Sequence, residues 1–113
     1  QHEKVETVLF PFNESFPQYQ LARQQMLGAC GLLTFIIKAD TVEQIEKFCN
    51  NLRHILMAVS WGGHESLIIP KCSGMSATHF NPLNKDHRML RLYVGLEEGE
   101  YIIKDLEQAF LLI

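Results

Sequence analysis

A chain of 113 residues can form one domain around a single hydrophobic core, but it is too short for two ordinary domains. Hydrophobic residues make up 47% of it, which is typical of a folded soluble protein. The formal net charge of −3, with no block of Lys or Arg, argues against nucleic acid or an anionic membrane as the main partner. No apolar run approaches the roughly 20 residues that a membrane-spanning helix needs.

The three cysteines, Cys30, Cys49 and Cys72, are odd in number and show no C-x-x-C spacing. Each has small or apolar neighbours, where a free cysteine behaves as a small hydrophobe. We therefore expect free thiols in a reducing compartment, the cytoplasm, and not a secreted disulfide framework. The chain has no signal-peptide pattern and does not open with Met, so we expect it to be part of a longer cytoplasmic protein.

The first predicted elements are a strand over residues 5–10 and a helix that is entered near Ser15 and Pro17 and stopped by Gly28. We expect three side chains of this helix to point into the core: Leu21, Ala22 and Met26.

Residues 31–38 (GLLTFIIK) predict a strand that is apolar on both faces, which favours a central place in the sheet. A helix follows, capped by Asp40 or Thr41, with Glu43 or Gln44 placed for a capping box. Its apolar residues recur at spacings of three and four, which predicts a buried stripe of Val42, Ile45, Phe48, Cys49 and Leu52.

Two short strands, residues 55–60 and 67–69, flank the sequence Ser60-Trp61-Gly62-Gly63. One interpretation of this sequence is a tight turn between the strands. The other is a binding site, because adjacent glycines leave room for a ligand to approach the backbone. Residues 72–88 then predict a loop of unusual length, which is typical of a lid, an interface or disorder.

The last predicted strand, residues 89–96, alternates between apolar and mixed side chains. A final helix begins in an acidic turn formed by Glu97, Glu98 and Glu100, which suits the positive end of a helix dipole. Its expected buried stripe is Ile102, Ile103, Leu106, Ala109 and Phe110. The order β-α-β-α-β-β-β-α predicts an α+β domain of two layers, a mostly antiparallel sheet with helices on one face.

Arg91 is the candidate ligand-binding residue. The Leu and Val side chains of its strand must face the helices, so Arg91 projects from the opposite face of the sheet. Either water solvates this face, or another domain or a ligand covers it. The partly apolar neighbours Met89 and Tyr93 favour the covered face. An arginine there is suited to binding a carboxylate in bidentate fashion.

Ser60 ends a strand, and its hydroxyl and the backbone N–H groups that follow are suited to holding an anion. No G-x-S-x-G motif is present, so we do not expect a hydrolytic nucleophile. Trp61 fits a role in core packing as well as it fits a role facing a substrate. The five histidines lack a zinc-finger or H-E-x-x-H spacing, so we expect no metal site.

These features resemble the C-terminal domain of the pyridoxal-phosphate-dependent Cys/Met metabolism enzymes, the trans-sulfuration family. Its members include cystathionine γ-synthases, cystathionine lyases, methionine γ-lyases and sulfhydrylases. The resemblance covers nearly the whole chain, and its segments occur in the family's order. Residues 2–5, 21–26 and 28–35 resemble the family's entry into this domain. Residues 58–67 (AVSWGGHESL) resemble its A-x-S-L-G-G-x-E-S-L segment, and residues 91–98 (RLYVGLEE) resemble its R-L-S-V-G-L-E-D segment, followed by the closing residues 105–109 (DLEQA).

The resemblance implies a type I pyridoxal-phosphate fold in which a large domain, absent from this chain, binds the cofactor through a lysine. Residues 1–113 would be a single small C-terminal domain that positions a sulfur-containing amino acid. Arg91 would bind the substrate's α-carboxylate, with Ser60 and the backbone of Trp61 orienting it, and Val59 would face the substrate side chain. The full-length enzyme would be a homotetramer or homodimer that catalyses β- or γ-elimination or replacement.

The chain departs from the family in two ways that matter. None of its lysines lies in an S-x-T-K motif, so we expect no catalytic or cofactor-binding residue here and no activity of this domain alone. Residues 70–88 differ most from the family, and their role stays open. The alternative function is a stand-alone, non-catalytic module that binds an amino acid or a protein through the Arg91 face.

Overall fold

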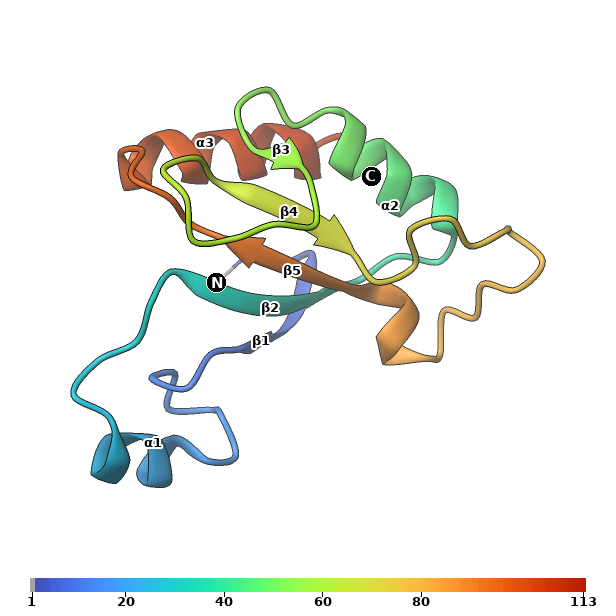
Figure 1. Cartoon of the computed structure of the whole chain (residues 1–113). Helices are drawn as coiled ribbons and strands as arrows, with labels where there is room; N and C mark the ends of the chain where they lie inside the picture. Colours follow the sequence, from blue (N-terminus) through green and yellow to red (C-terminus); the bar gives the residue numbers. More distant parts are fainter. Residues whose placement is uncertain (1) are drawn as a thin grey trace.

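The computed structural model describes residues 2–113 as a five-stranded sheet in the order β1-β2-β5-β4-β3, with three α-helices (Figure 1). All neighbouring strands are antiparallel except β3 and β4. The α+β prediction is therefore confirmed. The elements are β1 (Val5–Leu9), α1 (Tyr19–Gln25), β2 (Leu32–Ile37), α2 (Val42–Asn50), β3 (Leu56–Met57), β4 (Leu67–Pro70), a 3₁₀ helix (Lys85–Arg88), β5 (Met89–Tyr93) and α3 (Gly99–Phe110).

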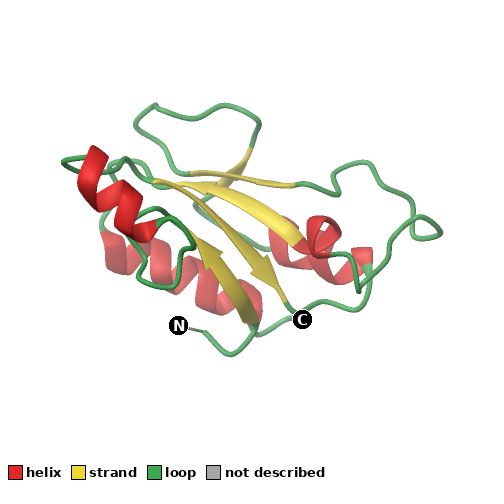
Figure 2. Cartoon of the chain, turned by 90° about the horizontal axis from the view of Figure 1, so that it is seen from below, coloured by secondary structure: helices red, strands yellow, loops and turns green. Residues whose placement is uncertain are grey.

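The helices α2 and α3 cover one face of the sheet, and the loop between β3 and β4 lies on the other side (Figure 2). The core forms between these helices and the sheet because the strands alternate their side chains between the two faces. On β5, Leu90 and Leu92 are buried while Met89, Arg91 and Tyr93 are partly exposed. The core centres on the fully buried side chains of Ile37, Ile45, Phe48, Ile68 and Leu90.

The start of α2 follows its sequence signal closely. Thr41 caps the helix by accepting a hydrogen bond from the Gln44 backbone N–H, and the Gln44 side chain accepts one from the Thr41 backbone N–H. This reciprocal capping box fixes the direction in which the chain enters the helix. The predicted stripe is buried except for Leu52, which is partly buried against the core.

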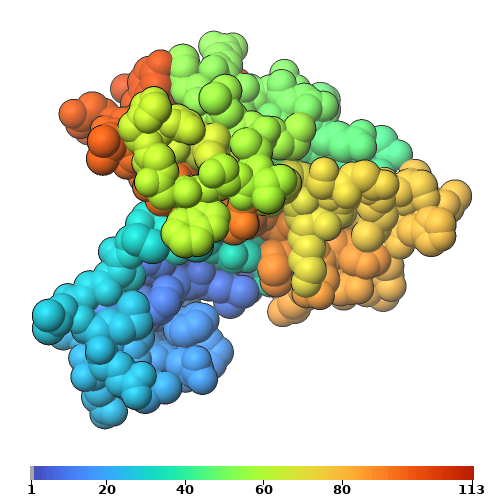
Figure 3. Space-filling view, in the orientation of Figure 1, coloured from blue at the N-terminus to red at the C-terminus, as the bar shows by residue number. Residues whose placement is uncertain are grey.

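The helix α1 is shorter and less buried than expected. It begins at Tyr19, and of its apolar residues only Ala22 is buried, whereas Leu21 is 43% exposed and Met26, just beyond the helix, is 39% exposed. The prediction that Leu21 and Met26 point inward was wrong. The arm that carries α1 stands away from the body of the domain (Figure 3), so the body offers these side chains no surface to pack against.

The helix α3 begins at Gly99, so Glu97 precedes it and does not form its first turn as predicted. Ile103, predicted to be buried, is 54% exposed, while Asp105 is 2% exposed. The Asp105 carboxylate accepts backbone hydrogen bonds from three successive residues of the turn between α2 and β3, Arg53, His54 and Ile55. A carboxylate with these partners can lie in the core, because its charge is hydrogen-bonded.

The strand β3 is much shorter than the predicted residues 55–60, and it runs parallel to β4. A tight turn joins antiparallel strands, whereas parallel neighbours need a connection that returns along the sheet. Residues 58–66 make this return as a loop. The interpretation of this stretch as a simple turn between paired strands was therefore wrong.

Residues 71–84 are turns and irregular chain, and the 3₁₀ helix that follows is anchored to the sheet. Arg88 is 9% exposed, and its guanidinium donates to the Glu6 carboxylate at 2.6 Å and to the Ile37 carbonyl at 3.0 Å. Lys85 lies 2.9 Å from the other Glu6 oxygen. Through these pairs the end of the long loop is attached to β1 and β2.

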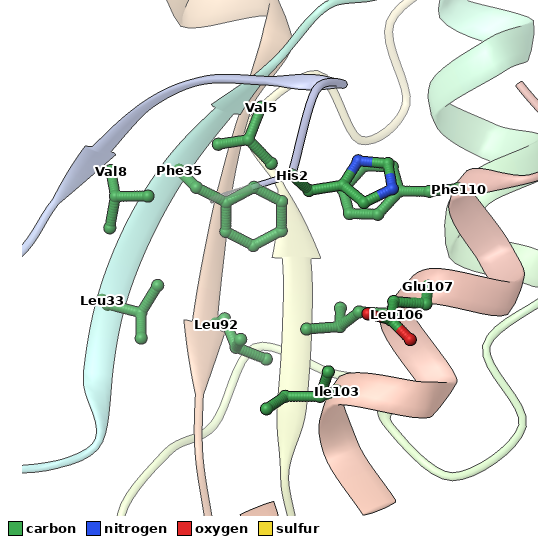
Figure 4. Close-up of a pocket in the computed structure, with 10 residues that line it drawn as sticks. All are labelled: His2, Val5, Val8, Leu33, Phe35, Leu92, Ile103, Leu106, Glu107 and Phe110. Atoms are coloured by element: carbon green, nitrogen blue, oxygen red, sulfur yellow. The ribbon is translucent and has the colours of Figure 1, made fainter. Parts of the chain in front are cut away.

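The helix face carries an open apolar groove of about 430 Å³ between α3 and the first two strands (Figure 4). Val5, Val8 and Leu33 line its sheet side, and the His2 ring stacks on Phe110 with 4.4 Å between the ring centres. The groove lies on the face opposite Arg91, and its apolar lining does not suit a charged ligand.

In residues 2–113, no helix combines the length and the apolar character that crossing a membrane requires. In the same part of the chain, no three His, Cys, Asp or Glu side chains are grouped to hold a metal ion.

Candidate functional site

Arg91 lies at the centre of the open sheet face. It pairs with Thr34 of β2 on one side and with Ile69 of β4 on the other. Its two neighbours along β5, Leu90 and Leu92, are buried beneath the helices, so Arg91 must project from the opposite face. The structure therefore agrees with the face predicted for Arg91.

The loop 58–66 is fastened over this face by two side chains of β5. The Arg91 guanidinium (Nη2) donates a hydrogen bond to the backbone carbonyl of Val59. Two residues further along the strand, the Tyr93 hydroxyl donates to the carbonyl of Gly63 at 3.0 Å. Residues separated by about thirty positions in sequence are thereby brought together, and the peptide that joins Val59 to Ser60 lies against Arg91.

The predicted site residues of this loop are open to solvent. Val59 is 71% exposed, Trp61 is 57% exposed, and Ser60 is also exposed. This exposure rules out core packing as the role of Trp61. Gly62 follows with a φ of +91°, a conformation that side chains disfavour, so a glycine is needed for the loop to turn here.

A second set of contacts holds the far end of the loop. Ser66 is completely buried, and Glu97 accepts two hydrogen bonds from it, from the backbone N–H at 2.7 Å and from the hydroxyl at 2.7 Å. The Ser66 hydroxyl accepts a hydrogen bond from the Gly95 N–H at 2.9 Å. The segment after β5 also meets the loop through the Leu96 N–H, which donates to the His64 carbonyl at 2.8 Å.

The charge of Glu97 is stabilised by these contacts. Partial burial of the carboxyl would raise its pKa, but the hydrogen bonds from the Ser66 backbone and hydroxyl outweigh burial and hold the pKa below its ordinary value. The proximity of His64 acts in the same direction. Glu97 is therefore an anion in the folded protein at neutral pH.

The space beside Arg91 is a shallow hollow of about 360 Å³. Its polar lining residues include Arg91, Thr34 and Lys71, and its apolar lining residues include Met89 and Ile69. The loop residues 59–61 are not part of its lining. A guanidinium has five N–H donors, and within residues 2–113 only one hydrogen bond from Arg91 is found. The remaining donors suit a bidentate carboxylate.

The sequence did not point to Glu97 and Ser66 as parts of this region, because Glu97 was interpreted as a helix start. Ser66 and Glu97 lie 31 residues apart in the sequence, and a contact at this separation leaves no periodic pattern in the residues around either one. The sequence signal that could have suggested it is the glycine at position 95, since a glycine inside a strand pattern often marks a close approach of another part of the backbone. A Cβ added to Gly95 would lie 2.7 Å from the Glu65 carbonyl carbon and the same distance from Glu97 Oε2, so this position needs a glycine.

A sequence model of the family described as Cys/Met metabolism PLP-dependent enzyme matches residues 1–111. The chain belongs to this family. The resemblance seen in the sequence motifs is thereby confirmed.

Among the relatives, human cystathionine gamma-lyase is 39% identical over 113 residues, which cover 93% of this chain. Cystathionine gamma-lyase of Dictyostelium discoideum is 33% identical over 112 residues, and L-methionine gamma-lyase of Treponema denticola is 37% identical over 116 residues. The chain spans between 27% and 29% of the length of these relatives.

Proposed function

We propose that this chain is the substrate-positioning C-terminal domain of a pyridoxal-phosphate-dependent lyase or synthase that acts on sulfur-containing amino acids. The reaction would be a β- or γ-elimination or replacement on methionine, cystathionine or homoserine esters. Membership of the family supports the proposal, as do the names of the relatives. The observation that carries it is the contact between Arg91 and the Val59–Ser60 peptide on the open face of the sheet.

In this proposal Arg91 binds the α-carboxylate of the substrate. Its contact with the Val59 carbonyl restrains the guanidinium while leaving donors for two parallel hydrogen bonds to a carboxylate. The Ser60 hydroxyl and the Trp61 backbone N–H would complete the carboxylate site, and the exposed Val59 side chain would contact the substrate side chain. A carboxylate held in this way determines which bond of the substrate Cα is aligned for reaction.

Pyridoxal phosphate would be bound by another part of the full-length protein, because the residues present here do not fit it. The cofactor needs a lysine amine for a Schiff base. Lys71 lines the hollow beside Arg91, but it is ion-paired with Asp86 at 2.6 Å and is largely exposed. The remaining lysines are bonded to other protein groups (Lys4 and Lys85) or exposed to solvent (Lys38, Lys47 and Lys104). We therefore expect residues 1–113 alone to be inactive.

The experiment is kinetic analysis of the full-length protein with Arg91→Ala and Arg91→Lys substitutions. Loss of a charge-assisted contact of about 1.5–3 kcal/mol would raise KM for the amino acid by about 10- to 150-fold. Arg53→Ala is the matched control, because Arg53 is an exposed arginine in the turn after α2. An unchanged KM in both Arg91 variants would remove this residue from the substrate site.

Titration of the isolated chain with free amino acids separates the enzyme domain from a stand-alone binding module. An enzyme domain that lacks the cofactor-binding part should bind them without appreciable affinity. Saturable binding by the isolated chain would favour the module instead. We also expect the full-length protein to be a homodimer or homotetramer, and light scattering would test this oligomeric state. We expect it to lie in the cytoplasm, which cell fractionation would test.

A further inference from the structure

The carboxylate of Glu97 connects the loop 58–66 to the segment that follows β5. Each of its two oxygens accepts one hydrogen bond from Ser66, and the Ser66 hydroxyl in turn accepts one from the Gly95 N–H. We call these three residues the Glu97 clasp. All three hydrogen bonds lie between 2.7 and 2.9 Å, and Ser66 is completely shielded from solvent.

The clasp holds one end of the loop, and the sheet holds the other. At the near end, the Ala58 N–H donates to the Ile68 carbonyl at 3.1 Å, and Arg91 donates to the Val59 carbonyl. Between these attachments, Val59, Ser60 and Trp61 are exposed. Their position relative to Arg91 is therefore determined by how the loop is attached at its ends.

We propose that Glu97 is a positioning residue that holds the loop 58–66 in the place where Val59, Ser60 and Trp61 can act together with Arg91 on a carboxylate. This inference rests on the proposed substrate-binding function, since it assigns Glu97 a task within that site. The task assigned to Glu97 is to hold Ser66, to which each of its oxygens is bonded, and not to bind the substrate.

The hydrogen bonds of the clasp favour a carboxylate at position 97. Both groups that Ser66 directs at Glu97 are donors, and a carboxylate offers acceptors only. A glutamine at this position has one acceptor oxygen. If that oxygen accepts from the Ser66 N–H, the amide NH₂ faces the Ser66 hydroxyl, which can accept from it only by turning its own hydrogen away from residue 97. Because Ser66 is completely buried, this hydrogen then lacks the acceptor that Glu97 provides. Glu97→Gln therefore keeps the size of the side chain and loses the charge and one of the two hydrogen bonds that Ser66 donates.

The adjacent Glu98 provides a matched control. It is exposed, it caps α3 through its backbone without a side-chain hydrogen bond, and it has no described contact with the loop. Glu98→Gln removes the same charge one residue away. A general effect of net charge would change both variants alike, whereas the clasp predicts an effect at Glu97 alone.

The experiment uses the full-length protein with Glu97→Gln, Glu98→Gln and Ser66→Ala, and it has two readouts. Amide hydrogen exchange by mass spectrometry should be about tenfold faster in peptides from residues 58–66 of Glu97→Gln, and unchanged in peptides from β2. Steady-state kinetics should show KM for the amino acid raised about tenfold with little change in kcat. Glu98→Gln should match the unaltered protein in both.

The double variant Ser66→Ala/Glu97→Gln tests whether the two residues act as one unit. If they do, exchange in the loop should be no faster than in the faster single variant, because the same contact is already lost. Additive effects would contradict the clasp.

Unchanged exchange in the loop of Glu97→Gln would overturn the role of Glu97 in holding it. Faster exchange with an unchanged KM would show that the loop is held by Glu97 but does not position the substrate, and this would overturn the positioning role. Absence of activity towards sulfur-containing amino acids in the unaltered full-length protein would instead overturn the proposed function, and with it the substrate role of Glu97. The exchange measurement would still decide whether Glu97 holds the loop.

Discussion

Asp105 should contribute strongly to the stability of this domain, and Asp105→Asn is the substitution that tests it. The carboxylate is 2% exposed and accepts backbone hydrogen bonds from Arg53 at 2.8 Å, His54 at 2.9 Å and Ile55 at 3.0 Å. These three amides form the turn that leads from α2 into β3, so one side chain of α3 holds the start of the chain that leads to the loop 58–66.

The expected loss can be estimated from these contacts. Asparagine retains one acceptor oxygen, and its NH₂ group would face at least one backbone N–H. A hydrogen bond to a charged group contributes about 1.5–3 kcal/mol, and a buried donor without a partner costs about 1–3 kcal/mol. Since these effects overlap, we expect the free energy of unfolding to fall by about 2–4 kcal/mol.

The contribution of Asp105 to the free energy of unfolding should decrease as the pH falls. Burial would raise the pKa of Asp105, but the backbone N–H groups of Arg53, Ile55 and His54 outweigh burial and hold the pKa below its ordinary value. The stabilisation is therefore fully present above the pKa of the unfolded chain, about 3.9, and is lost as the pH falls through the lower pKa of the folded state. The difference between the unaltered chain and Asp105→Asn should shrink below about pH 4.

Urea unfolding of the 113-residue chain at pH 7 and at acidic pH measures this difference. Glu107→Gln, an exposed position on the same helix, is the control and should change the free energy of unfolding by less than about 0.5 kcal/mol. If Asp105→Asn is no more destabilising than the control, or if its effect grows as the pH falls, the Asp105 carboxylate does not stabilise the domain through these hydrogen bonds.

Two further predictions concern packing and the thiols. Gly95→Ala should destabilise the domain by about 1–3 kcal/mol in urea unfolding, because the new methyl group would overlap the backbone of the loop. Gly28→Ala is its control, since nothing lies within 4 Å of the added atom there, and equal effects of the two substitutions would contradict the close approach. A thiol reagent at neutral pH should label the exposed Cys30 in the folded chain, and Cys49 and Cys72 only after denaturation. Burial raises the pKa of Cys49 to about 12, so rapid labelling of Cys49 in the folded chain would show that the core is more open than described.

The parts of the fold that follow from local patterns could be predicted from the sequence. The apolar run of β2, the capping box at Thr41 and the alternation along β5 each report on backbone geometry within a few residues. From the alternation on β5 the face of Arg91 followed directly, because Leu90 and Leu92 could be buried only against the helices.

The parts that depend on contacts between distant residues could not be predicted. Asp105 is buried although the apolar pattern of α3 did not include it. Its hydrogen-bond partners lie about fifty residues earlier, so no local pattern could predict its burial. The length of β3 and its parallel direction depend on its pairing with β4. The apolar residues of α1 are exposed because the rest of the domain does not pack against them. Ser66 and Glu97 are hydrogen-bonded to each other. From residue type alone, the serine suggests a turn and the glutamate suggests a helix start, so neither predicts this contact.

We propose that Arg91 recognises the α-carboxylate of an amino acid in the full-length protein. The most direct test of this proposal compares inhibition by a non-reactive amino acid and by the carboxamide of the same amino acid, in the unaltered protein, in Arg91→Met and in Arg53→Ala. We expect the unaltered protein and Arg53→Ala to prefer the carboxylate by about 10- to 150-fold, and Arg91→Met to lose most of this preference. An undiminished preference for the carboxylate in Arg91→Met would contradict it.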